Sequence, residues 1–143
     1  MMTNSTIYDC SVIELSKVHH RSGNITAIEK NVGLPFEVKR VYYLYDVPGG
    51  ARRGGHAHQE LEQLIVAAGG CFDVIVDDGV NRKVIELNRP YFGLYIPKGI
   101  WREIVNFSSG AVCLVIASQK YDKNDYIRKY SEFKKLKSTR NPE

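Results

Sequence analysis

Short strand-like segments separated by turn residues recur along nearly the whole chain, and this spacing constrains the fold more than any other feature. Nine segments are rich in Val, Ile, Tyr and Phe and end at Gly, Pro, Asn or Asp clusters. Regular short strands without helical patterns between them predict an antiparallel β-sandwich or barrel. Asp77-Asp78-Gly79 also predicts a hairpin. The predicted strands are Tyr8–Leu15, Asn24–Lys30, Val38–Asp46, Leu61–Ala67, Cys71–Asp77, Arg82–Leu87, Tyr91–Ile96, Glu103–Phe107 and Val112–Ser118.

The period of the apolar residues changes only near the C-terminus. Tyr126, Tyr130, Phe133 and Leu136 are spaced by four, three and three residues, which places them on one helical face. This spacing predicts a short α-helix over about Lys123–Lys137. With the barrel at about 8–118, the 143 residues fit one domain, 1–143.

Composition excludes several classes of protein. No apolar run approaches the roughly 18–20 residues that cross a bilayer, and the N-terminus lacks a secretory signal, so we expect a cytoplasmic protein without membrane contact. Residues 1–119 hold 12 basic and 12 acidic side chains, so the net charge of +4 lies in the C-terminal 24 residues. No aromatic-basic motif accompanies that charge, and nucleic acid is not an expected partner. Cys10, Cys71 and Cys113 form no CxxC and are interpreted as buried apolar residues.

Two histidines stand two residues apart, at His56 and His58, at the start of a further strand-like stretch. Residues two apart in a strand share a face, so both imidazoles point the same way. Histidine titrates near neutral pH and can act as base and acid in one turnover. The pair is therefore the candidate catalytic centre.

The spacing around the pair resembles the first cupin motif, G-x5-H-x-H-x3-E-x6-G, and the second motif is partly present. The resemblance implies an all-β fold, a cupin-type antiparallel jelly-roll barrel with a short C-terminal α-helix and the histidines facing its cavity. The first motif is matched by Gly50, His56, His58, Glu62 and Gly69, and the second by Pro97, Gly99 and Asn106, with Arg102 where the motif has histidine.

Arg102 argues against a metal centre. A guanidinium has no lone pair to donate, and its charge would oppose a cation. His56, His58 and Glu62 could still form a facial triad of the non-haem iron type. Metal-free acid–base chemistry without a cofactor is the favoured interpretation.

The flanking sequence resembles the nucleotide-sugar 3,4-ketoisomerases, the WxcM-like cupin family, over about Tyr8–Phe133. The resemblance implies a dTDP-4-keto-6-deoxyglucose substrate, no cofactor, and a homodimer with or without exchanged N-terminal strands. It also implies a place before an aminotransferase in 3-amino-3,6-dideoxyhexose synthesis for surface polysaccharides such as lipopolysaccharide and S-layer glycans. The segments concerned are Arg40–Asp46, Arg53–His58, Leu61–Gln63, Val76–Gly79, Trp101 and Asp125–Arg128.

The same resemblance assigns roles in moving a ketone from C4 to C3. His56 is the carbon base, and His58 shuttles a proton between the C3 and C4 oxygens. Tyr43 is either a third cavity residue and proton donor or a core aromatic. An enediolate needs a cationic partner, for which Arg53 is the first candidate and Arg102 the second.

Two further residues keep alternatives open. Trp101 is a core anchor or a stacking surface for base or sugar. Glu62 orients a histidine or pairs with an arginine.

Two rival functions remain, a dTDP-sugar 3,5-epimerase-like cupin and a non-catalytic sugar-binding cupin. Paired titratable groups beside an arginine favour an enzyme over a simple binder. Because an arginine cannot donate a proton near pH 7, Arg102 favours the gluco product over the galacto product.

Overall fold

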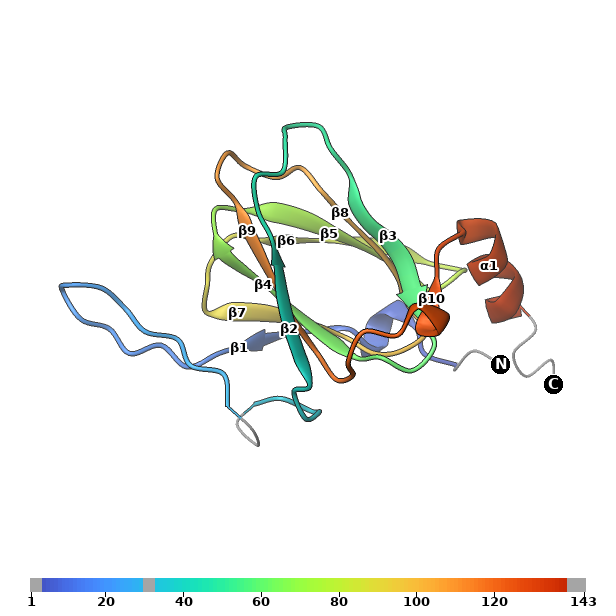
Figure 1. Ribbon diagram of the computed structural model, residues 1–143, viewed down its shortest axis with the longest axis horizontal. Helices are drawn as coiled ribbons and strands as arrows, with labels where there is room; N and C mark the ends of the chain where they lie inside the picture. Colours follow the sequence, from blue (N-terminus) through green and yellow to red (C-terminus); the bar gives the residue numbers. More distant parts are fainter. Residues whose placement is uncertain (1–3, 30–32, 139–143) are drawn as a thin grey trace.

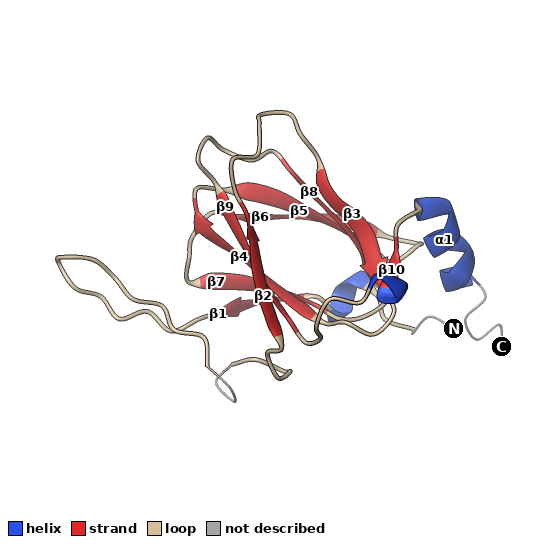
Figure 2. Ribbon diagram, in the orientation of Figure 1, coloured by secondary structure: helices blue, strands red, loops and turns tan. Residues whose placement is uncertain are grey.

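Two five-stranded antiparallel sheets make up most of the protein, as the computed structural model shows (Figure 1, Figure 2). The structure describes residues 4–29 and 33–138. The first sheet has the order β1-β7-β4-β9-β2, with bounds β1 Ser11–Glu14, β2 Arg40–Leu44, β4 Gln63–Gly69, β7 Phe92–Ile96 and β9 Val112–Ala117. The second has the order β10-β3-β8-β5-β6, with bounds β3 Arg53–His58, β5 Phe72–Asp77, β6 Arg82–Leu87, β8 Trp101–Val105 and β10 Tyr126–Ile127. The all-β prediction is confirmed.

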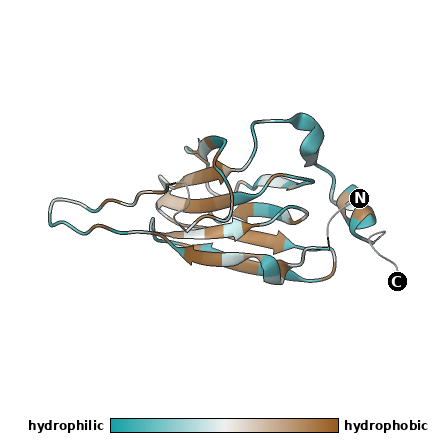
Figure 3. Ribbon diagram, turned by 90° about the horizontal axis from the view of Figure 1, so that it is seen from below, coloured by the Kyte–Doolittle hydropathy of each residue, from teal (hydrophilic) through white to brown (hydrophobic). Residues whose placement is uncertain are grey.

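The main core lies between the two sheets, because alternate residues of each strand point inward. Ile65 and Ala67 of β4 meet Val74 and Val76 of β5 and Ile104 of β8, and all five are fully buried. Figure 3 shows the strands as mostly hydrophobic and the connecting turns as mostly hydrophilic.

Most of the predicted strands are present, and the Asp77-Asp78-Gly79 hairpin joins β5 to β6 as expected. The prediction over Asn24–Lys30 is wrong for the residues that the structure describes, since residues 24–29 contain only an isolated bridge from Ile25 to Val18. This segment belongs to a loop that projects from the body (Figure 1). A strand needs a neighbour, and the loop extends beyond the edge of its sheet.

The C-terminal helix is shorter than predicted. A 3-10 helix covers Lys123–Asp125, β10 follows, and helix α1 covers only Tyr130–Ser138. Ile127 and Tyr126 pair with Ala57 and His58 of β3, so a sheet contact overrides the helical spacing there. Phe133 packs with Trp101 and Ala57 on the outer side of the second sheet.

The helices and the cysteines bear on two expectations from the sequence. None of the helices in residues 4–29 and 33–138 is long and apolar enough to cross a membrane. Cys113 is buried, Cys10 and Cys71 are half-buried, and all three are free thiols. Burial raises the pKa of Cys113 and of Cys10 to about 12, so neither is a reactive thiolate at neutral pH.

Candidate active site

A cavity of about 270 Å³ opens between the sheets, next to the histidines. Its walls come from β2, β3, β8, β10 and the segments on either side of β10. Four of the ten lining residues are arginines and none is acidic, which suits an anionic ligand. The lining residues are Arg40, Tyr42, Leu44, Arg53, Gly54, His56, Arg102, Tyr121, Tyr126 and Arg128.

Strand pairing places His56 beside Arg102. The two are direct partners across the antiparallel pair β3 and β8, so their side chains leave the sheet on the same face. The register shifts between Arg53 and His56, where Gly54 has a φ of 67°. An added Cβ at Gly54 would collide with the Arg102 guanidinium. The glycine and the bulge therefore make room for a buried arginine beside the histidines.

The two histidines and Asp125 form one hydrogen-bonded chain. His56 Nε2 lies 3.1 Å from His58 Nε2, and His58 Nδ1 lies 3.0 Å from Asp125 Oδ2. His58 is 2% exposed and His56 is 7% exposed. Backbone amides of Glu60 and Leu61 donate to the Asp125 carboxylate over 2.7 and 3.2 Å and fix its position. Asp125 was not predicted as a site residue because it falls within the expected helix.

The surroundings of both histidines favour the neutral imidazole. Burial, together with the charge of Arg102, lowers the pKa of His58 from 6.5 to about 3, with further contributions from Arg40 and Arg128. The same causes lower the pKa of His56 well below its usual range. The Asp125 carboxylate favours a proton on His58 Nδ1. The charges of three arginines oppose a second proton on the same ring. A neutral imidazole keeps one nitrogen lone pair and can act as a base.

Arg102 lines the cavity and is held there by three hydrogen bonds. Its Nη2 donates to the Tyr42 hydroxyl and to Gln63 Oε1, each over 3.0 Å, and its Nη1 donates to the Gly54 carbonyl over 3.2 Å. Its Nε is buried and lacks a partner among the described residues. Arg102 thus presents a fixed positive charge with one donor to spare.

Arg40 and Arg128 add charge at the mouth of the cavity. Arg40 stacks over the rings of Tyr42 and Tyr121, at 4.4 and 5.2 Å, and Arg128 stacks over Tyr126 at 4.2 Å. Arg40 Nη1 is buried without a hydrogen-bond partner in the part of the chain that the structure describes. A buried guanidinium nitrogen without an acceptor is costly, and a bound anion would supply one.

Arg53 lines the same cavity, as predicted, from the first residue of β3. Its side chain is exposed, whereas that of Arg102 is 1% exposed. Of the two arginines proposed from sequence, Arg102 is therefore the one next to the histidines, and Arg53 lies at the rim.

The prediction that Tyr43 lies in the cavity is wrong. Tyr43 is 58% exposed on the outer face of β2, where its ring lies 5.7 Å from that of Tyr45. Tyr42, one residue earlier, points inward and contacts Arg102. Both faces of this strand carry a tyrosine, so the alternation of side chains alone could not show which face points inward.

Glu62 also lies outside the cavity, and among the described residues it neither orients a histidine nor pairs with an arginine. Its carboxylate accepts a hydrogen bond from the Tyr95 hydroxyl over 2.6 Å, and Tyr95 packs in the apolar cluster on the outer face of the first sheet. Gln63, the first residue of β4, occupies the inward position instead. The motif spacing pointed to Glu62, and a spacing longer by one residue would have pointed to Gln63.

Trp101 is a core anchor and not a stacking surface in the cavity. It neighbours Arg102 on β8, so its side chain leaves the opposite face. It is 4% exposed, packs against Phe133 and Tyr130, and donates from Nε1 to Glu103 over 3.0 Å. The expected choice between anchor and stacking surface is thereby resolved.

The facial triad considered from sequence is not assembled, since Glu62 points away from the histidines. Within residues 4–29 and 33–138, no three His, Cys, Asp or Glu side chains form a group that could hold a metal ion. The amide of Gln63 and the guanidinium of Arg102 occupy the space beside the histidines.

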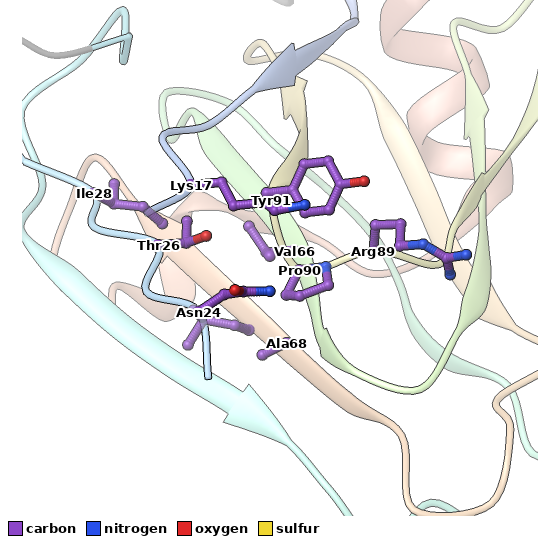
Figure 4. A pocket seen from close by; sticks show the side chains of 10 residues that line it. Lys17, Asn24, Thr26, Ile28, Val66, Ala68, Arg89, Pro90 and Tyr91 are labelled. Atoms are coloured by element: carbon purple, nitrogen blue, oxygen red, sulfur yellow. The ribbon is translucent and has the colours of Figure 1, made fainter. Parts of the chain in front are cut away.

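A larger hollow of about 550 Å³ lies elsewhere, between the projecting loop and the outer face of the first sheet (Figure 4). Lys17 and Tyr91 face each other there, with the ammonium 4.4 Å from the ring centroid. Because this hollow lacks the paired titratable groups of the smaller cavity, we assign the chemistry to the histidine site.

Comparisons with known proteins agree with this geometry. Residues 8–138 match the family model described as WxcM-like, C-terminal. The TDP-4-oxo-6-deoxy-alpha-D-glucose-3,4-oxoisomerase of Aneurinibacillus thermoaerophilus is 46% identical over 124 residues, which cover 87% of this chain and 89% of the relative.

Two solved structures are similar over nearly their whole length. The TDP-quinovose 3,4-ketoisomerase of Campylobacter jejuni has 46% identity and a TM-score of 0.84, over 89% of this chain and 98% of that one. A variant of the 3,4-ketoisomerase QdtA of Thermoanaerobacterium thermosaccharolyticum, in complex with TDP-4-keto-6-deoxyglucose, has 36% identity and a TM-score of 0.91, over 95% and 99%. The chain therefore belongs to the WxcM-like family of sugar 3,4-ketoisomerases.

Proposed function

We propose that this enzyme moves the keto group of dTDP-4-keto-6-deoxy-D-glucose from C4 to C3 through an enediol, with His56 and His58 as the proton carriers and no metal or cofactor. The observation that carries this proposal is the pair of hydrogen-bonded histidines beside a buried arginine. The relatives named above, which act on TDP-linked sugars, support the choice of substrate.

The chemistry requires two carbon proton transfers and one oxygen proton transfer. His56 takes the C3 proton, the C3–H electrons form a C3=C4 double bond, and the C4 carbonyl becomes an enediolate oxygen. His58 moves the proton of the C3 hydroxyl to the C4 oxygen, a step in which its Nε2 leaves His56 Nε2 and turns to the substrate. C4 then takes the proton back as the C3–O bond becomes a carbonyl. Each such positioned transfer contributes typically about 10²–10⁴-fold to the rate.

The arginines supply the charge that this sequence of steps needs. Arg102 lies beside His56 and stabilises the negative oxygen of the enediolate. Arg40 and Arg128, with Arg53 at the rim, bind the diphosphate of the substrate. When the diphosphate binds, its negative charge offsets the arginines and raises the pKa of both histidines towards neutrality, where proton transfer is most efficient.

We further propose the gluco-configured 3-keto product. Returning the proton to C4 on the face from which it left C3 gives the galacto product. A gluco product needs delivery from the opposite face, by water or another donor. Arg102, fixed by Tyr42, Gln63 and Gly54, can order such a water but cannot donate its own proton. The similarity to an enzyme of TDP-quinovose, a 6-deoxyglucose, supports the same choice.

Two wider expectations belong to the proposal. The 3-ketone is what a 3-aminotransferase requires, so the reaction feeds 3-amino-3,6-dideoxyhexose synthesis for surface polysaccharides in the cytoplasm. We also propose a homodimer in which a second copy covers the outer face of the first sheet. Val41, Tyr43 and Tyr45 are more than half exposed on this face, beside the apolar cluster that includes Leu64 and Ile116. Light scattering after size exclusion tests the dimer.

Proton NMR of dTDP-4-keto-6-deoxyglucose incubated with the protein in deuterated buffer tests the function. A 3-keto product is expected, and a large H3–H4 coupling after reduction or transamination would identify the gluco configuration. Deuterium at C3 and C5 with the ketone still at C4 would indicate a 3,5-epimerase instead. No exchange would leave only a sugar-binding protein.

The variant His56→Asn separates catalysis from binding in the same assay. We expect turnover to fall by at least 100-fold with the substrate affinity nearly unchanged, because the substitution removes a proton carrier and little contact area. Turnover close to that of the unsubstituted protein would refute the role of His56 as base.

A further inference from the structure

We infer that Asp125 is a positioning residue that sets the tautomers of both histidines. In the resting enzyme the lone pair that is free to accept a proton from the substrate then lies on His56 Nδ1. This inference rests on the proposed function for its catalytic meaning, but its geometry stands independently. Three hydrogen-bonded groups in a row leave little freedom for where the protons lie.

The direction of the chain follows from Asp125. Asp125 Oδ1 accepts a hydrogen bond from the backbone N–H of Glu60, and Oδ2 accepts one from the backbone N–H of Leu61. The carboxylate is therefore held as an acceptor. His58 Nδ1, 3.0 Å from Oδ2, must therefore carry the proton of that contact. A neutral imidazole carries one N–H, which leaves His58 Nε2 as an acceptor.

The contact between the two histidines places the proton of His56 in the same way. His58 Nε2 faces His56 Nε2 at 3.1 Å, and an acceptor on one side requires a donor on the other. His56 therefore carries its proton on Nε2, and its Nδ1 keeps the lone pair. Asp125 thus orients the basic nitrogen of a residue that it does not touch, two hydrogen bonds away.

The arrangement also gives the proton a place to go. When His56 Nδ1 accepts the proton from C3, the imidazolium can pass its Nε2 proton to His58 Nε2. The positive charge then lies on His58, next to the Asp125 carboxylate and away from His56. The reverse transfer returns the proton to His56, which releases it to the water that protonates C4 from the opposite face, so no proton is gained or lost. This places the stabilising carboxylate where the charge is temporarily stored.

Long-range ¹H–¹⁵N correlation NMR of the ¹⁵N-labelled protein at pH 7 measures the tautomers directly. We expect His58 to show the Nδ1–H form and His56 the Nε2–H form. In Asp125→Asn the amide oxygen keeps the short contact to Glu60, while the NH₂ group gives up the longer contact to Leu61 and faces His58 Nδ1. Both tautomers should then reverse. Turnover should fall about 100-fold or more with a smaller change in KM, and Asp125→Glu should recover part of the loss.

Asp122→Asn is the matched control. Asp122 caps the same 3-10 helix, accepting from the Asn124 amide over 3.0 Å, and is exposed. It should leave both tautomers and turnover unchanged.

The inference and the proposed function fail separately in these experiments. A spectrum of the unsubstituted protein with the His56 proton on Nδ1 overturns the inference, whether or not the Asp125 variants fold. Unchanged tautomers in a folded Asp125→Asn protein also overturn it. Expected tautomers in a protein without isomerase activity would refute the proposed function alone.

Discussion

Arg102 Nη2 donates to Gln63 Oε1 over 3.0 Å, and each of these side chains is only 1% exposed. The pair closes the side of the cavity next to the histidines. Arg102 stands where the second cupin motif has histidine, and Gln63 follows the glutamate position of the first motif by one residue. The two side chains bond to each other, so in the proposed mechanism the positive charge that an enediolate needs comes from Arg102.

Turnover should therefore survive removal of divalent ions. Prolonged dialysis against EDTA followed by assay in chelated buffer should change kcat by less than about twofold. The measurement is the initial rate of 3-keto product formation before and after dialysis. Loss of activity on chelation, restored by adding one divalent ion, would show that the metal-free mechanism is wrong.

Tyr42 and Tyr43 offer a matched pair of substitutions on one strand. Tyr42→Phe removes an acceptor of the buried Arg102, and hydrogen bonds to charged groups contribute about 1.5–3 kcal/mol. We expect the free energy of unfolding to fall by about that amount and kcat/KM to fall about tenfold. Tyr43→Phe, on the outer face, should stay within about 0.5 kcal/mol and retain its activity. Urea unfolding and steady-state kinetics measure both effects, and equal losses in the two variants would contradict the inward orientation of Tyr42.

These two tyrosines also show where sequence reasoning reaches its limit. The spacing of short strands predicted the sheets, and the two-residue spacing of His56 and His58 predicted their common face. Over β2 and the residue after it, however, one set of alternate residues is Arg40, Tyr42 and Leu44 and the other is Val41, Tyr43 and Tyr45. Either set could line a cavity or face outward. Only pairing with β9 fixes which set points inward.

Asp125 illustrates a second limit. Its neighbours Tyr126 and Tyr130 fit a helical face, so local spacing predicted a helix there. The pairing of β10 with β3 decides the conformation instead. His58 and Asp125, which this pairing brings together, are 67 residues apart in the sequence. Long-range contacts of this kind leave no periodic signal in a single sequence.

Arg40 should contribute to substrate affinity more than to the chemical step. Its buried Nη1 lacks a partner among the described residues and lines the cavity. Arg40→Gln should raise KM by about 10–100-fold, as expected for a lost hydrogen bond to a charged group, with a smaller effect on kcat. Arg89→Gln, at the other hollow, is the control. A KM for Arg40→Gln equal to that of the control would exclude Arg40 from the anion site.

Stability should decline below about pH 6.5 because of the histidines. The folded-state pKa of His58 is lowered from 6.5 to about 3, and that of His56 is lowered as well, so the unfolded chain binds more protons in this range. Their contribution to stability is complete above pH 6.5 and is lost as the pH falls, by up to about 1.4 kcal/mol per pH unit for each histidine. Asp125, whose pKa is raised by burial, contributes the opposite slope from its ordinary value of 3.8 upwards.

Urea unfolding of the free enzyme between pH 4.5 and 7.5 measures this dependence. His58→Asn and His56→Asn should each flatten the curve between pH 4.5 and 6.5. The lowered pKa values of Asp78 and Glu103 affect stability mainly below this window. If both variants keep the full slope, the histidines are not the groups that titrate.

The pairing of β10 with β3 makes the histidine chain depend on a strand of two residues. Asp125 immediately precedes this strand and Tyr126 begins it, and both contact His58. Unpairing of β10 from β3 would separate Asp125 from His58 and leave the other strand ladders of both sheets in place. A local opening of the protein can therefore dismantle the hydrogen-bonded chain without unfolding the sheets.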